Sequence, residues 1–160
     1  MLELLAPAGN LDAVIAAVQN GADAVYMGFG DGFNARRSAD NFTRESFAKA
    51  VRYCHIRGCK VYVTLNTLVG DREMESAAAL AQQASDAGAD AILVQDLGLA
   101  RVLRDALPDI PLHASTQMSI HNLAGVEAAA EMGITRAVLS RELSLEQIRF
   151  ISQHASIETE

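Results

Sequence analysis

Short apolar runs alternate with longer amphipathic stretches along the whole chain. Three segments share one arrangement, in which a Gly precedes an apolar run: NGADAVYMG at 20–28, AGADAILVQD at 87–96 and MGITRAVLSRE at 132–142. A Gly in this place is typical of a helix C-terminus, since it readily adopts positive φ. The pattern predicts strands near 2–5, 23–28, 60–66, 90–95, 111–117, 136–140 and 157–160. It predicts helices near 11–20, 44–57, 72–87, 97–107, 123–132 and 145–154.

Two of these helices have clear start signals. Thr43 is a predicted N-cap, and Phe42 and Phe47 are spaced to form a hydrophobic staple around it. Ser144 and Gln147 have the spacing of a capping box, in which each side chain bonds to the backbone of the other residue.

Strict alternation of strands and helices indicates a parallel sheet, built as an open doubly wound sheet or as a closed barrel. Buried strands of an open sheet are apolar on both faces. Near 60–66 and 111–117, however, apolar positions alternate with polar ones. A barrel whose interior opens into a polar mouth explains that division. The expected fold is therefore an α/β, (β/α)8 TIM-type barrel.

The barrel is expected to be incomplete, with about six βα units and a seventh strand. Eight units need about 200 residues or more, and the chain has 160. Residues 1–160 are interpreted as one domain, the N-terminal part of a longer protein, expected to be inactive in isolation. The alternative is a complete, seven-stranded open sheet.

Composition narrows the class of protein. Half of the residues are hydrophobic and 21% are charged, which excludes a disordered chain. No apolar run approaches the roughly 20 residues that span a bilayer, and no secretory signal is visible. Only two cysteines are present, so a reducing, cytoplasmic setting is expected. The net charge of −7 argues against general binding of polyanions but leaves room for a small anionic ligand.

Candidate catalytic residues lie on the polar face of the predicted strands. The period of two places His113, Ser115 and Gln117 on the barrel interior, with Gln117 nearest the mouth. His113 is a candidate acid, base or ligand, and a buried polar network is the alternative. A hydrolase triad of His113 with Ser115 is not expected, because neighbouring same-face positions rarely give nucleophile–base geometry.

Glu3 is predicted to point inward from the first strand. A lone buried carboxylate is unfavourable, so Glu3 is either a proton carrier or the salt-bridge partner of an inward Arg. Glu158 and Glu160 share a face. Their spacing selects no metal, and no metal site is predicted.

Candidate substrate-binding residues follow the predicted strands, on the catalytic side of a barrel. An Arg in such a loop can hold a carboxylate or phosphate through two parallel hydrogen bonds. A solvated loop charge or a helix-entry ion pair is the alternative, and Asp96 could instead be a helix N-cap. The candidates are Asn34, Arg36, Asn66, Gln95, Asp96, Arg141 and Glu142, and Ser115 on the fifth predicted strand is also a candidate for binding substrate.

Other residues carry weaker signals. Gly28, Gly30 and Gly32 do not lead directly into a helix, so a mouth loop is expected rather than a nucleotide-binding motif. Cys54 and Cys59 match no metal-binding spacing and are expected to pack in the core.

Seven blocks in the right order resemble the U32 peptidase (collagenase-like) family over essentially the whole chain. They are ELLAPAGN at 3–10, NGADAVYMG at 20–28, FNAR at 33–36, VYVTLNT at 61–67, VQDLGLAR at 94–101, HASTQMSIHN at 113–122 and LSRELSLEQI at 139–148. The resemblance implies a barrel-type catalytic domain in a cytoplasmic enzyme. Related proteins hydroxylate pyrimidines in ribosomal or transfer RNA or act on the ubiquinone ring. The STQM and SREL blocks are most similar to the RNA-acting branch.

The resemblance also implies cofactors and partners for the full-length parent. These are an iron–sulfur cluster, prephenate as a small anionic cosubstrate held by Arg36 and Arg141, and RNA as substrate. The family's cysteine signature lies beyond the seventh strand, and Cys54 and Cys59 do not match it, so no cofactor is expected within this segment. A peptidase is the alternative activity. A non-catalytic subunit that completes a barrel with a partner is a further alternative, because exposed sheet edges favour self-association.

Overall fold

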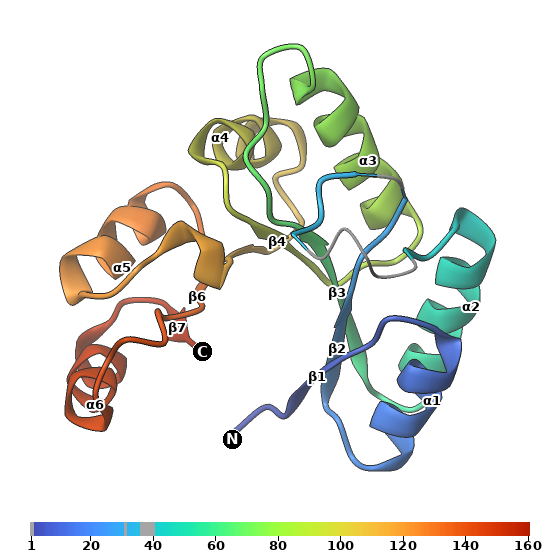
Figure 1. Cartoon of the computed structure of the whole chain (residues 1–160), viewed down its shortest axis with the longest axis horizontal. Coiled ribbons are helices and arrows are strands. Elements are labelled where there is room, and N and C mark those ends of the chain that lie inside the picture. Colours follow the sequence, from blue (N-terminus) through green and yellow to red (C-terminus); the bar gives the residue numbers. More distant parts are fainter. Residues whose placement is uncertain (1, 31, 36–40) are drawn as a thin grey trace.

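The computed structural model describes residues 2–30, 32–35 and 41–160, which form a curled half-barrel with helices on its outer side (Figure 1). The described residues form seven strands: β1 (Leu5–Pro7), β2 (Ala24–Met27), β3 (Lys60–Leu65), β4 (Ala91–Val94), β5 (Leu112–Ala114), β6 (Arg136–Ala137) and β7 (Glu158–Thr159). They also form six α-helices: α1 (Leu11–Gln19), α2 (Arg44–His55), α3 (Met74–Asp86), α4 (Leu97–Ala106), α5 (Leu123–Glu131) and α6 (Leu145–His154). The predicted fold class, a barrel of six βα units and a seventh strand, is confirmed.

The strands pair in sequence order, and every pair is parallel. Each connection between neighbours therefore returns through a helix, as parallel pairing requires. β1 and β7 are the two ends of this sheet. The carboxyl ends of all the strands consequently meet at one mouth, and their amino ends meet at the opposite side.

Two large apolar clusters pack the helices against the outer face of the sheet. A small third cluster fills part of the inner face, with Tyr62 and Leu93 buried and Tyr26 partly buried. The register also places His113 beside Leu93 on β4 and Arg136 on β6. The inner face therefore carries Tyr62 and His113, as the alternating pattern predicted, together with apolar Leu93 and charged Arg136.

The local signals at the helix ends are confirmed. The glycines of the three repeated segments, Gly21, Gly88 and Gly133, have φ values of 89°, 98° and 83°. Thr43 accepts a hydrogen bond from the backbone N–H of Ser46, and Ser144 and Gln147 form the full capping box.

Three predicted strands have different bounds. The strand predicted near 136–140 ends at Ala137. The first strand was predicted near 2–5 but spans Leu5–Pro7, so Glu3 precedes it. The fifth was predicted through residue 117 but ends at Ala114. Ser115 caps a short 3₁₀-helix, η1 (Thr116–Met118), by accepting a hydrogen bond from the backbone of Gln117. Such local side-chain bonds compete with strand pairing, so Gln117 is not a strand residue.

Candidate active site

A polar cavity of about 350 Å³ occupies the mouth of the half-barrel, where the strands end. Its lining comes from the segments that follow β2, β3, β5, β6 and β7, and from inward side chains of the strands themselves. Eight residues with polar or charged side chains contribute to it: Tyr26, Thr64, Asn66, Ser115, Thr116, Gln117, Arg141 and Glu160. Its size lies within the range of small-molecule sites, roughly 300–1,000 Å³.

The Asn66 side chain connects three of these segments. Its Oδ1 accepts a hydrogen bond from the backbone N–H of Ala35 at 3.0 Å. Its Nδ2 donates to Ser115 Oγ at 3.2 Å, and the same hydroxyl accepts from the Gln117 N–H at 3.4 Å. Asn66 therefore fixes the loop after β2 and the turn after β5 relative to the end of β3.

Among the described residues that line the mouth cavity, one side chain is positively charged and one is negatively charged. Arg141 is exposed and presents a guanidinium group. Glu160 also lines the cavity, with its Oε2 3.9 Å from Arg136 Nη1. Burial raises the pKa of Glu160, although the charge of Arg136 opposes this. Arg141 is thus the group in this lining that suits an anion.

Other predicted site residues lie outside the lining of this cavity. Asn34 is buried and donates to Asn41 Oδ1 at 3.1 Å, and it lines a neighbouring pocket. Gln95 is partly buried after β4, and Glu142 is exposed in the turn after β6. Arg36 lies outside the described residues.

Asp96 has the structural role that was proposed as its alternative. It is the N-cap of α4, since its Oδ1 accepts from the Leu99 N–H at 2.8 Å. Its Oδ2 also accepts from the Val69 N–H at 3.4 Å. The carboxylate therefore ties the loop after β3 to the start of α4.

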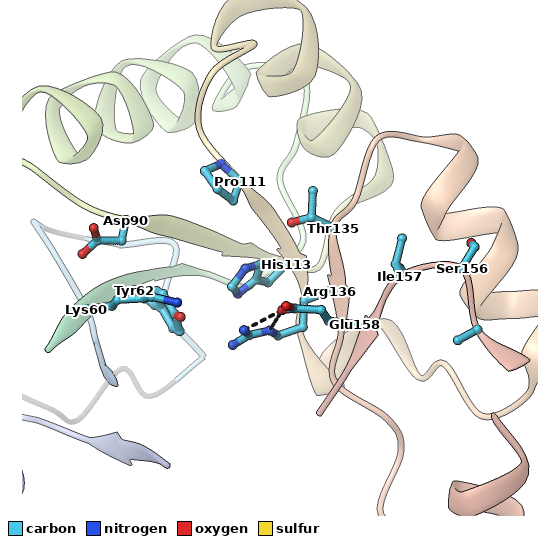
Figure 2. Close-up of a pocket in the computed structure, with 11 residues that line it drawn as sticks. Lys60, Tyr62, Asp90, Pro111, His113, Thr135, Arg136, Ser156, Ile157 and Glu158 are labelled. Carbon is cyan, nitrogen blue, oxygen red and sulfur yellow. Dashed lines mark hydrogen bonds and ion pairs between the residues drawn. The ribbon is translucent and has the colours of Figure 1, made fainter. Parts of the chain in front are cut away.

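A second polar cluster lies at the opposite end of the strands and includes Glu3. The Glu3 carboxylate accepts hydrogen bonds from Lys60 Nζ at 2.9 Å, Tyr62 Oη at 2.8 Å and Arg136 Nη1 at 2.5 Å. Arg136 also donates to Glu158 through Nε and Nη2, at 2.8 and 2.6 Å (Figure 2). Lys60, Tyr62, Arg136 and Glu158 line a cavity of about 740 Å³ at this end.

The Glu3 contacts decide between its two predicted roles in favour of the salt bridge. Burial raises the pKa of its carboxyl, but the bonds from Arg136, Lys60 and Tyr62 outweigh that and hold the pKa at about 2. The group is therefore ionised at neutral pH and poorly suited to carry a proton. Its place at the amino ends of the strands is the side of a barrel associated with stability rather than chemistry.

His113 lies in this second cluster rather than at the mouth. Its side chain is buried, and its ring packs edge-on against Tyr62, with 4.9 Å between centroids. Burial, reinforced by the charge of Arg136, lowers the pKa of His113 to about 4, so it is neutral at pH 7. Its Nδ1 has no hydrogen-bond partner among the described residues. Ser115 bonds elsewhere, so the two do not form a nucleophile–base pair.

Sequence reasoning missed Arg136, Lys60 and Tyr62 as members of this cluster. Arg136 interrupts an otherwise apolar run at the start of β6, and its side chain is only 10% exposed. A charged residue in a buried strand needs a partner. That signal, together with the prediction that Glu3 pairs with an inward Arg, could have identified it.

Neither cysteine fits an iron–sulfur cluster. Cys54 and Cys59 are buried free thiols in the apolar layer that includes α2 and β3. Burial raises the pKa of Cys54 to about 12 and also raises the pKa of Cys59. Clusters are commonly held by four thiolates, so these two thiols do not provide a site. The described residues also contain no group of three or more His, Cys, Asp or Glu arranged to hold a metal ion.

Comparison with known proteins gives consistent matches over nearly the whole chain. The family model of peptidase family U32 matches residues 9–160. The 23S rRNA 5-hydroxycytidine C2501 synthase of Escherichia coli (strain K12) is 43% identical over 95% of this chain and 22% of its own length. The tRNA hydroxylation protein P1 of Bacillus subtilis (strain 168) is 39% identical over 99% of this chain and 37% of its own.

Two further comparisons extend these matches. The Collagenase of Porphyromonas gingivalis is 33% identical over 94% of this chain and 36% of its own length. The chain therefore spans 22–37% of the length of these three curated relatives. The structure of the U32 peptidase Mk0906 superposes with a TM-score of 0.80 at 18% identity, over 99% of this chain and 67% of that one. This last likeness supports the fold.

No helix in the described part of the chain is long and apolar enough to cross a membrane.

Proposed function

This chain belongs to peptidase family U32, and from that premise we propose that its protein hydroxylates a pyrimidine in ribosomal or transfer RNA in the cytoplasm. The observation that carries the proposal is the identity of 43% and 39% to relatives named for rRNA and tRNA hydroxylation. In this proposal residues 1–160 supply the first part of the catalytic barrel, and the mouth cavity receives the base.

The mouth cavity has suitable chemistry for a base removed from its stack. Enzymes that modify a base hold it between apolar or aromatic side chains and bond to its polar edge. Leu93 and Tyr26 supply apolar and aromatic surface here, and the Gln117 amide and the Thr64 hydroxyl supply polar groups. The Asn66 hydrogen bonds hold the walls that carry these groups in a fixed relation.

The cosubstrate is proposed to be a small carboxylate such as prephenate, bound by Arg141. Guanidinium groups bind carboxylates through two parallel hydrogen bonds. Arg141 supplies such a group at the mouth, and Arg36, which follows β2 in the sequence and lies outside the described residues, is proposed as the second. An iron–sulfur cluster, when bound, would supply electron transfer. Because Cys54 and Cys59 do not fit it, its ligands are proposed to come from another part of the protein.

The test uses cells that lack the gene and are complemented with the full-length protein. Arg141→Ala is expected to lower the hydroxylated pyrimidine at least about tenfold, a loss typical of removing a charged hydrogen bond. Arg149→Ala, which removes an exposed Arg on α6 outside the cavity, is the matched control and is expected to restore the wild-type level. Equal restoration by the two variants would contradict the role of Arg141.

A peptidase is the second candidate, because the Collagenase relative shares 33% identity. Nucleophilic proteolysis needs an activated hydroxyl or thiol near a base. Ser115 bonds to Asn66 and Gln117 instead, and both thiols are buried with raised pKa values. Cleavage of denatured collagen by the purified protein would favour this candidate if it persisted after removal of iron and stopped in Arg36→Ala.

The ends of the sheet favour a further, non-enzymatic possibility. β1 and β7 are its outer strands, and unpaired edges can accept another strand. Self-association of this segment, or pairing with a partner subunit, predicts a particle size that rises with concentration in light scattering. A monomer at high concentration would exclude self-association and leave the RNA hydroxylation proposal unchanged.

A further inference from the structure

A second pocket lies beside the mouth cavity, between the loops that follow β2 and β3. Its volume is about 560 Å³, and its lining includes Phe33, Asn34, Thr67, Leu68 and Glu73. None of these residues lines the mouth cavity. We refer to this space as the side pocket.

The side pocket and the mouth cavity share a thin wall. Ala35 and Asn66 line the mouth cavity, whereas Asn34 and Thr67, their neighbours in sequence, line the side pocket. The hydrogen bond from the Ala35 N–H to Asn66 Oδ1 joins the two loops at this wall. One RNA strand can therefore place consecutive nucleotides in the two spaces, one on each side of this bonded pair.

The described lining of the side pocket has groups that suit a base. Glu73 contributes a negative charge that repels phosphate, and Asn34 and Thr67 contribute polar groups. Phe33 and Leu68 offer apolar surface, and Leu68 is 73% exposed. Unpaired bases are commonly held by such surfaces together with hydrogen bonds to their edges.

Two features indicate that the side pocket is shaped for binding. Phe33 has a φ of 55°, which is unfavourable for a bulky residue, and strained backbone of this kind clusters at functional sites. The Glu73 carboxylate is held in place, because its Oε2 accepts from the Gly70 N–H at 2.9 Å. A fixed carboxylate is an acceptor for an exocyclic amino group, such as N4 of cytosine.

We infer that the side pocket binds the nucleobase next to the one that is modified, and that Glu73 selects a base with an exocyclic amino group. The inference rests on the proposed function, since it assumes an RNA substrate. It assigns part of the sequence preference of the enzyme to a pocket outside the reaction site.

The test measures binding of the full-length protein to fluorescently labelled single-stranded RNA oligomers. Each oligomer has one central cytidine, and its 5′ and 3′ neighbours are varied in turn. At one of the two neighbouring positions, cytidine is expected to bind about fivefold or more tightly than uridine, at the lower end of the discrimination given by a specific base contact. Glu73→Gln is expected to reduce that ratio to below about twofold, because the neutral amide can donate to O4 of uridine as well as accept from N4 of cytosine.

Glu75→Gln is the matched control, because Glu75 is an exposed acid in the first turn of α3 and lines neither space. It is expected to keep the wild-type ratio. An equal preference in Glu73→Gln and wild type, or no preference in wild type, would overturn the inference. The nucleoside content of cellular RNA decides the proposed function separately, so that the two failures are distinguishable.

Discussion

At the scale of single residues, Arg136 is expected to matter most for stability. Its side chain is 10% exposed and binds Glu3, whose side chain is 21% exposed. Arg136→Met leaves the Glu3 carboxylate without its main partner, which is expected to lower the free energy of unfolding by about 3–5 kcal/mol. Urea denaturation checks this value.

A double variant separates the ion pair from simple loss of packing. Glu3→Gln combined with Arg136→Met is expected to cost less than the sum of the two single changes, because the second change removes the unpaired group left by the first. Strict additivity would show that the pair itself contributes nothing.

His113 gives a prediction for the pH dependence of stability. Its pKa is about 4 in the folded protein and about 6.5 when unfolded. Between these values the unfolded chain binds more protons, so the contribution is complete above pH 6.5 and is lost as the pH falls toward 4. Glu3, with a pKa of about 2, loses its contribution only below about pH 4.5.

The measurement is urea denaturation of wild type and His113→Asn at pH 7 and pH 5. Wild type is expected to lose about 2 kcal/mol more than the variant over this range, since 1.5 pH units inside the titration window correspond to that amount. An equal loss in both proteins would contradict a neutral, buried His113.

Residue roles were predictable from sequence where chemistry allows few solutions. A carboxylate directed inward must be paired, so an inward Arg could be expected for Glu3 without its identity. Arg136 itself was missed because the predicted strand near 136–140 does not alternate between polar and apolar positions, so a period of two did not reveal its inner face. The contacts of Asp96 as an N-cap were among the alternatives that the sequence already offered.

At the scale of elements, the Asn66 bridge explains how the loops of the mouth are ordered. Asn66→Ala removes the acceptor of the Ala35 N–H and the donor to Ser115. The Ala35 amide is expected to exchange with deuterium about fivefold faster, because losing one hydrogen bond changes stability by about 1 kcal/mol.

Asn20→Ala is a suitable control for that exchange measurement. Asn20 also bonds through its side chain, to the Ala16 carbonyl at the end of α1, but it is exposed and distant in sequence. It is expected to leave the Ala35 amide unchanged. If Asn66→Ala also left that amide unchanged, Asn66 would not order the loop.

The observed ends of helices agree with the sequence prediction where the prediction rested on a local signal. Positive φ at Gly21 and the Ser144 capping box lie where the spacing predicted them. The end of β5 differs from the prediction, because the Ser115 side chain bonds to the Gln117 backbone and starts η1. An alternating pattern of polar residues there is equally compatible with a strand, so periodicity alone could not distinguish the two.

At the scale of the whole molecule, the curl of the sheet follows from its two unlike faces. The outer face packs against helices through large apolar clusters, whereas the inner face carries Tyr62, His113 and Arg136. The division between these faces was visible in the sequence and favoured a barrel over an open sheet. The sequence did not show which inward polar residues lie at the mouth and which lie at the opposite end of the strands, because this placement depends on the register between strands.

The central claim is that the protein hydroxylates RNA, and mass spectrometry of nucleosides tests it most directly. Ribosomal and transfer RNA from cells with and without the gene are digested and compared. The account predicts that deletion removes one hydroxylated pyrimidine and that the full-length gene restores it. An identical nucleoside profile in both strains would contradict the claim and direct attention to a quinone or peptide substrate.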